Sequence, residues 1–230
     1  MPVYVYCLVE RNTPPPADLR GIDGGAVRSL VVGDLAVWVS DVGERAIAAS
    51  PPRALAHDEV VRRALDLQSP LPARFGQIFA ADEELRAAVA SRASDWALGL
   101  KRVSGSVEMT IRILLEVLAD LPANDELAPE SGLGYLSRVR ARQTVEHVMR
   151  EGADTLRESI TRAVRDWIRE EAWTPLLVGS RALSVSHLVA REVLTDYRRA
   201  VRGFMDAQPA LRLMVSGPWA PYSFTPLRHD

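Results

Sequence analysis

The stretch Val107-Glu108-Met109-Thr110-Ile111-Arg112-Ile113 decides how the chain is divided. Its odd-numbered positions are apolar, and the positions between them are polar or charged. Because successive side chains of a strand point to opposite faces, this alternation predicts a strand with one buried face. The residues before it have a helical pattern. We therefore expect a boundary just before this strand, between an N-terminal domain over 1–102 and a second domain over 103–217.

The second domain is expected to alternate strands and helices after this first strand. Apolar residues between Tyr135 and Glu171 step by three and four, which predicts one long amphipathic helix with a bend at Gly152. Further elements are predicted as strands at Thr174–Val178, Ala182–Val189 and Leu211–Val215 and as a helix at about Arg191–Asp206. This β-α-β-β-α-β order is typical of a ferredoxin-like fold, and the right-handed crossover rule then places both helices on one face of the sheet.

The N-terminal domain is predicted to mix strands and helices as well. Residues 3–9 form an almost wholly apolar run, which predicts a central strand that is buried on both faces. The other expected elements are a hairpin of Val27–Val32 and Leu35–Val39, a helix from Pro51 to just before Pro70, and a helix over Asp82–Gly99. The fold class is therefore α+β with two domains, followed by an aromatic and proline-rich tail over 218–230.

Composition excludes several classes of protein. The 230 residues carry 28 basic and 30 acidic side chains, so the chain has no overall positive charge of the kind that nucleic-acid binding uses. A single cysteine allows no internal disulfide, which fits a reducing compartment. No apolar run approaches the roughly 20 residues of a membrane span, and the N-terminus lacks the pattern of a secretory signal. We expect a cytoplasmic protein without nucleic-acid or membrane partners.

The sequence contains no recognisable catalytic or cofactor-binding motif. The histidines at 57, 147, 187 and 229 have no spacing that would aim two rings at one metal ion. His187 lies in an expected strand next to Ser186, so the two side chains point to opposite faces. No phosphate-binding loop motif is present, and the paired carboxylates lie on expected helix surfaces. The chain is therefore predicted to have no enzymatic activity, no metal and no cofactor.

Five segments, in order along nearly the whole chain, resemble the gas vesicle protein F/L family (GvpF/GvpL). They are Val3-Tyr4-Val5-Tyr6, Leu71-Pro72-Ala73-Arg74-Phe75-Gly76, Gly105-Ser106-Val107-Glu108, Gly134-Tyr135-Leu136 and Gly217-Pro218-Trp219-Ala220-Pro221-Tyr222-Ser223-Phe224. The chain departs from the family pattern at Ala73, Met109 and Ala220, and none of these differences removes a charge.

The resemblance implies an accessory protein of gas vesicle assembly. Family members are similar to two-domain α+β proteins with a ferredoxin-like second domain, and they are associated with the small hydrophobic shell protein and with other accessory proteins. The resemblance implies no enzymatic activity. Two alternatives stay open, a homo-oligomeric ferredoxin-like scaffold and a small-molecule-binding protein. Oligomeric state and the choice between an F-like and an L-like member also stay open.

The residues predicted to bind a partner fall in three places. They are the tail aromatics Trp219, Tyr222 and Phe224, the arginine Arg74, and the first strand of the second domain at Val107, Met109 and Ile111. A shell subunit with a large exposed apolar surface would aggregate unless a partner offered a complementary groove or strand edge. The alternative for the tail is that it folds back over the chain's own core. For Phe75 and Gly76 we favour a core side chain and a backbone requirement.

Overall fold

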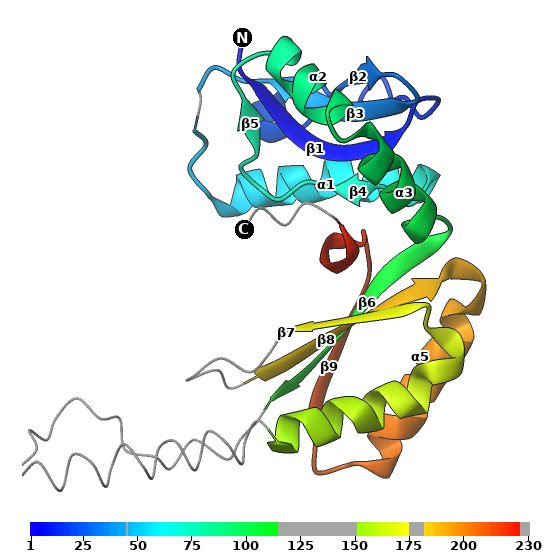
Figure 1. Cartoon of the computed structure of the whole chain (residues 1–230). Helices are drawn as coiled ribbons and strands as arrows, with labels where there is room; N and C mark the ends of the chain where they lie inside the picture. Colours follow the sequence, from blue (N-terminus) through cyan, green and yellow to red (C-terminus); the bar gives the residue numbers. More distant parts are fainter. Residues whose placement is uncertain (45, 115–150, 175–181, 226–230) are drawn as a thin grey trace, which may run out of the picture. The chain divides into compact units, whose positions relative to one another are not determined.

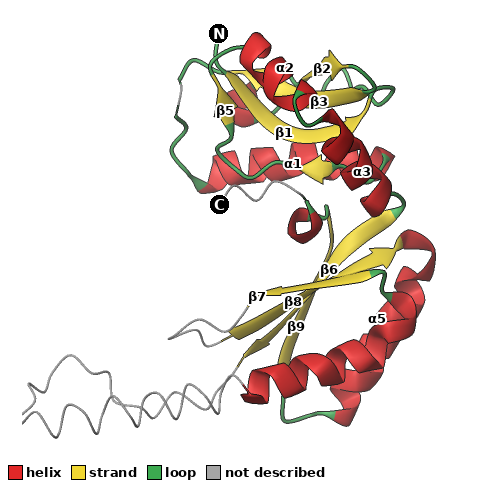
Figure 2. Ribbon diagram, viewed as in Figure 1, coloured by secondary structure: helices red, strands yellow, loops and turns green. Residues whose placement is uncertain are grey.

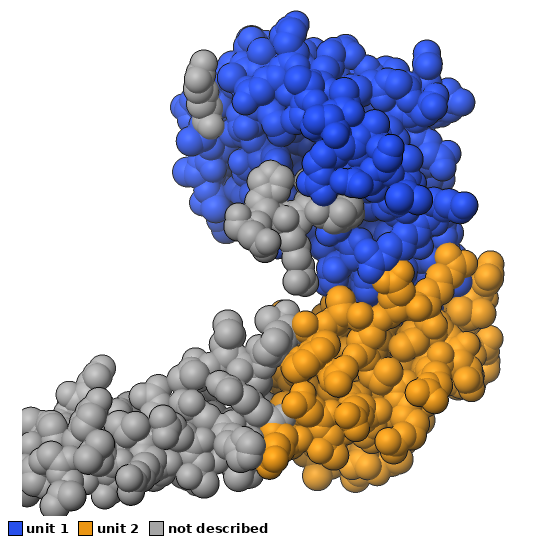
Figure 3. All heavy atoms as spheres, in the orientation of Figure 1, with its two compact units in different colours: residues 1–109, 188–191, 217–230 blue, residues 110–187, 192–216 orange. Residues whose placement is uncertain are grey.

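The chain forms two compact units (Figures 1 and 3). The computed structural model describes residues 1–44, 46–114, 151–174 and 182–225. One unit comprises 1–109, 188–191 and 217–230, and the other comprises 110–187 and 192–216. The tail therefore groups with the N-terminal unit, and strand β6 (Ser106–Leu114) begins in one unit and continues into the other. The domain limits predicted from the sequence, 1–102, 103–217 and 218–230, stay predictions, because the two units are defined by contacts between residues and not by continuous stretches of sequence.

The sheet of the N-terminal unit has β1 (Val3–Glu10) at its centre, as the sequence predicts. Its strand order is β2-β3-β1-β4, and β5 also pairs with β1. The other strands are β2 (Arg28–Val32), β3 (Leu35–Asp41), β4 (Leu71–Pro72) and β5 (Ile78–Phe79). The pairings of β1 with β3, β4 and β5 and the β2–β3 hairpin are all antiparallel. Every residue of β1 except Glu10 is buried, so the expectation of burial on both faces is confirmed.

Three helices accompany this sheet (Figure 2). They are α1 (Pro51–Leu67), α2 (Asp82–Ala90) and α3 (Ala93–Val103). The prediction of one helix over Asp82–Gly99 is wrong, because the helical hydrogen bonding stops at Ser91 and Arg92. The hydroxyl of Ser91 donates to the carbonyl of Ala88, and a serine that bonds nearby backbone competes with helix continuation.

A polar and aromatic cluster lies beside β1. The hydroxyl of Tyr4 is 2.9 Å from Nδ1 of His57 and accepts a hydrogen bond from the Gly76 amide. The other ring nitrogen of His57, Nε2, is 3.2 Å from the carbonyl oxygen of Ala73. The Phe75 ring packs edge-on against both Tyr4 and His57. This cluster joins the first and second family-like segments to α1, and we call it the Tyr4 cluster.

Tyr6, two residues along the same strand, has an equally complete set of partners. Its hydroxyl donates to Oγ of Ser40 at 3.0 Å and accepts the amide of Ile22 at 2.8 Å. The Ser40 hydroxyl in turn donates to the carbonyl oxygen of Ala26. The phenol of Tyr6 therefore ties the loop before β2 to the central strands.

The second sheet has the strand order β7-β8-β6-β9. Its strands besides β6 are β7 (Glu170–Thr174), β8 (Ala182–Ala190) and β9 (Arg212–Trp219). Residues 151–164 are helical, and α5 covers Leu194–Ala207. Figure 1 shows both helices on the same side of this sheet, as the crossover rule predicts.

Two predicted limits in this part of the chain are wrong. The predicted helix over Tyr135–Glu171 ends at residue 164, and a 3-10 turn at Arg165–Trp167 leads to β7, so Glu171 belongs to a strand. The last strand, expected at Leu211–Val215, extends to Trp219 and includes the start of the tail. The first half of the predicted helix and the predicted strand beyond Thr174 lie outside the described residues.

The second unit also contains a polar cluster, of which His187 and Tyr197 are fully buried. His187 of β8 is in a strand, as predicted, and its Nδ1 is 2.8 Å from the hydroxyl of Tyr197 on α5. Its Nε2 lies 3.6 Å from the carboxylate of Glu171, which accepts a 2.6 Å hydrogen bond from Arg157. The Arg157 guanidinium stacks over the ring of Trp173. The cluster therefore connects β7 and β8 to both helices.

We predict that Tyr6→Phe lowers the free energy of unfolding by roughly 1–3 kcal/mol, because it leaves the buried Ile22 amide without an acceptor and removes the hydroxyl that donates to Ser40. Urea unfolding at pH 7 measures the change. A loss below about 0.5 kcal/mol would show that water replaces the phenol at this position.

Stability should also fall as the pH is lowered from 7 to 5. Burial lowers the pKa of His57 from the ordinary 6.5 to about 4, and burial also lowers the pKa of His187 below its ordinary value. Between those values the unfolded chain binds protons that the folded chain does not, so each histidine removes up to about 1.4 kcal/mol per pH unit. Urea unfolding of the wild type and of His57→Gln checks this. The variant retains hydrogen-bonding groups but does not titrate, so its pH dependence should be about half as steep; an unchanged slope would contradict the assignment.

Candidate functional site

The tail is folded against the N-terminal unit. After β9 it forms a 3-10 turn at Tyr222–Phe224, drawn in red in Figure 1. Ala220 and Phe224 are buried, and only 2% of the Phe224 surface is exposed. The carbonyl oxygen of Phe224 accepts a 3.4 Å hydrogen bond from Arg102 of α3. These contacts fit the alternative that the tail covers the chain's own core.

Glu108 of β6 holds this turn with both oxygens of its carboxylate. Oε2 accepts the backbone amide of Ser223 at 2.8 Å, and Oε1 accepts the Ser223 hydroxyl at 2.7 Å. Glu108 is only 5% exposed. Sequence reasoning missed this role, because the alternation of β6 assigns Glu108 to the polar face. The signal available was its place in one family-like segment while Ser223 lies in another.

The tail approaches β6 closely at Gly217. The φ angle of Gly217 is +117°, which side chains rarely adopt. A Cβ atom there would lie 2.7 Å from the carbonyl oxygen of Glu108 and 2.9 Å from Sδ of Met109. Only glycine fits this position. The docked tail, which we define as Gly217–Thr225, is therefore fixed at its start by Gly217 and further along by Ser223 and Phe224.

Two aromatic residues of the docked tail remain accessible. Trp219 is 42% exposed and Tyr222 is 38% exposed. Burial, followed by the negative charge of nearby Asp58, raises the pKa of the Tyr222 hydroxyl above its ordinary value. The tail thus presents two aromatic rings from a backbone that is held in place.

The predicted binding residues of β6 are not at the surface. Val107, Met109 and Ile111 are each 1 to 2% exposed. Strand β6 also lies between β8 and β9, so it is not an edge of the sheet as expected for strand pairing with a partner. These three side chains belong to the core, because the apolar face of the alternating strand is the one that folding buries. Partner binding at these three positions has no support in the structure.

The Arg74 segment divides between core and surface. Phe75 packs against Tyr4 and His57 but is only half-buried, so it lies at the margin of the core, whereas the φ angle of +87° at Gly76 agrees with the expected backbone requirement. Arg74 itself is exposed, and among the described residues it has no hydrogen bond or ion pair. Its role in partner binding stays a prediction.

In the second unit, β9 is at one edge of the described sheet. Met214 and Val215 of this strand are exposed. An edge strand with exposed apolar side chains is a template for pairing with another strand. The sheet edge expected at β6 is therefore supplied by β9.

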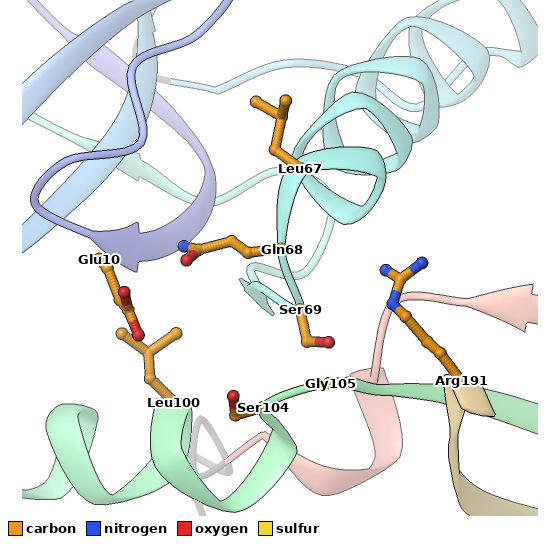
Figure 4. Close-up of a pocket in the computed structure, with 8 residues that line it drawn as sticks. All are labelled: Glu10, Leu67, Gln68, Ser69, Leu100, Ser104, Gly105 and Arg191. Carbon is orange, nitrogen blue, oxygen red and sulfur yellow. The ribbon is translucent and has the colours of Figure 1, made fainter. Parts of the chain in front are cut away.

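A small pocket of about 280 Å³ lies in the N-terminal unit (Figure 4). It is lined by Glu10, Leu67, Gln68, Ser69, Leu100, Ser104, Gly105 and Arg191. The Ser69 hydroxyl is occupied, since it donates to the carbonyl of Ser106 and accepts the Ser106 amide. Arg191 donates to the carbonyl of Leu65. With these groups engaged in holding the chain together, the pocket gives little support to the small-molecule alternative.

No group of side chains suited to hold a metal ion occurs among the described residues. Within the same part of the chain, none of the helices has the length and apolar character needed to span a membrane. The single cysteine, Cys7, is buried in β1, and burial raises the pKa of its thiol. The described surface therefore offers apolar, aromatic and charged side chains for contacts with other molecules.

Comparisons with known proteins agree on one family. The family model described as gas vesicle synthesis protein GvpL/GvpF matches residues 2–226. Gas vesicle protein F of Streptomyces sp. (strain CB03234) is 29% identical over 253 residues, which cover 97% of this chain and 99% of that protein. Gas vesicle protein L of the same strain is 26% identical over 256 residues, which cover 99% of this chain and 94% of that protein.

A solved structure shows the same fold. The crystal structure of GvpF from Anabaena sp. PCC7120 matches with a TM-score of 0.79 at 17% identity, covering 99% of this chain and 97% of that one. The mixed α+β class predicted from the sequence is thereby confirmed. Since the family model spans nearly the whole chain, this chain belongs to the gas vesicle synthesis protein GvpL/GvpF family, and its role lies in gas vesicle assembly.

Proposed function

We propose that this chain is an accessory protein that binds the small hydrophobic shell protein during gas vesicle assembly, through the exposed aromatic rings of its docked tail. One observation carries the proposal. Trp219 and Tyr222 are accessible although their neighbours Ala220 and Phe224 are buried in the chain. Large aromatic residues at a surface are characteristic of the side chains that contribute most to protein interfaces.

The physical reason for such a partner is the apolar surface of an unassembled shell subunit. A subunit that exposes this surface before polymerising would aggregate, so a temporary cover is needed. Tryptophan and tyrosine supply large apolar contact areas and lose little side-chain entropy on binding. Because the tail backbone is already held by Glu108 and Phe224, less ordering remains to be done when the partner binds.

The remaining features of the chain agree with a binding role. The proposal includes no enzymatic activity and no cofactor, and it places the chain in the cytoplasm at the growing vesicle, where other accessory proteins are further partners. It also includes a ferredoxin-like second domain. In its favour, β6 and β8, the first and third strands of the expected unit, lie side by side in the middle of the sheet.

The proposal predicts that Trp219→Ala combined with Tyr222→Ala weakens binding of the shell protein by about 30-fold or more, the factor that corresponds to a loss of 2 kcal/mol. Co-expression with the shell protein, followed by pull-down of tagged chain and titration of the retained fraction, measures this. A matched control is Leu55→Ala combined with Leu98→Ala, which removes two exposed apolar side chains elsewhere in the N-terminal unit.

The control variant should retain the shell protein as the wild type does. If the wild type retains none, the proposed function is wrong. If the tail variant and the control variant both retain it fully, the shell protein binds elsewhere, and Met214 and Val215 on the β9 edge become the next residues to substitute.

A further inference from the structure

We propose that Glu108 is a positioning residue for partner binding: its carboxylate holds the Tyr222–Phe224 turn and so fixes the directions in which Trp219 and Tyr222 point. The inference rests on the proposed function for the identity of the partner. The effect of Glu108 on the tail itself can be measured without that partner.

The geometry of the contact favours an orienting role. The two oxygens of one carboxylate accept from two atoms of one residue, the amide nitrogen and the hydroxyl of Ser223. Two hydrogen bonds between the same pair of residues fix rotation as well as distance, which a single bond does not. Hydrogen bonds to an ionised carboxylate are also about twice as strong as those between neutral groups.

The burial of Glu108 argues against a purely stabilising role. Its neighbours Val107 and Met109 are buried apolar residues, and Glu108 itself is 5% exposed. Removing a carboxylate from water is costly, and an apolar residue of similar size is often neutral or stabilising in such a place. A carboxylate at this position is therefore better explained by the backbone and hydroxyl that it orients than by the free energy of folding.

The other contacts that hold the docked tail do not by themselves fix the orientation of the Tyr222–Phe224 turn. Gly217 fixes the beginning of the tail by its close approach to β6, and Phe224 anchors its end by burial. Burial of a ring is non-directional, and the single 3.4 Å hydrogen bond from Arg102 to the Phe224 carbonyl still leaves rotation about that bond. Glu108 removes this freedom. Because Tyr222 immediately precedes Ser223, the backbone that carries its exposed side chain is held together with the turn.

The test compares Glu108→Ala with Glu108→Gln in the full chain. Alanine removes both acceptors. Glutamine keeps one oxygen for the Ser223 amide, and its own amide donates to the Ser223 hydroxyl, so it should restore the hold without the charge. Amide hydrogen exchange of the peptide covering 217–225 reports the order of the tail, and retention of the shell protein in the pull-down reports binding.

We expect Glu108→Ala to speed exchange in the tail peptide about tenfold and to weaken retention of the shell protein by a similar factor. Glu108→Gln should stay within about threefold of the wild type in both measurements. The matched control is Glu84→Ala, because Glu84 also accepts a backbone amide, that of Ala80 at 2.7 Å, and lies in the N-terminal unit away from the tail. This control should change neither measurement.

Ser223→Ala guards against a variant that fails to fold. It removes only the hydroxyl bond to Glu108 and should produce a smaller loss in the same direction. Unchanged exchange and retention in Glu108→Ala would overturn the inference, and so would equal losses in Glu84→Ala. If the wild type retains no shell protein, the proposed function fails, while the exchange rates still decide whether Glu108 positions the tail.

Discussion

Burial of strand β1 on both faces is the constraint on which the N-terminal unit depends. The strand contains two phenols, Tyr4 and Tyr6, and a buried hydroxyl without a partner is costly. His57 of α1 and the amide of Gly76 satisfy Tyr4, and the Ile22 amide and Ser40 satisfy Tyr6. The need to pair two hydroxyls therefore determines where α1, the Arg74 segment and the loop before β2 lie. Burial of apolar surface drives the folding of this unit, and the hydrogen bonds of Tyr4 and Tyr6 select one arrangement of the elements around β1.

The same requirement, that a buried polar group has hydrogen-bond partners, also applies to the docked tail. Glu108 is a buried carboxylate, and it requires donors in the same way that Tyr4 and Tyr6 require partners. Its donors come from Ser223, 115 residues further along the chain. In the N-terminal strands the buried polar groups organise the core. At Glu108 the buried polar group holds a segment of the tail that includes the exposed residues Trp219 and Tyr222.

Sequence patterns predicted the elements whose burial repeats with a period. The alternation of β6, the apolar run of β1 and the hairpin of β2 and β3 are all present, because each pattern states directly which face is buried. The end of the long helix was missed, since Glu171 continues the helical period of apolar and polar positions although it belongs to strand β7. Trp219 and Tyr222 were recognised as candidates from composition. Glu108 was not, because periodicity describes neighbours in sequence, whereas its partner is distant in the chain.

A tail held by its own core has a consequence for specificity. Two exposed rings are a small apolar area, below the size at which a protein surface tends to associate with any apolar partner. A fixed direction for Trp219 and Tyr222 then favours a partner whose surface is complementary in shape, since a mismatched surface gains contact with only one ring. A loose tail would contact many apolar surfaces weakly. On the proposed function, in which the chain must distinguish shell subunits from other apolar surfaces, orientation of the two rings contributes more than additional apolar area.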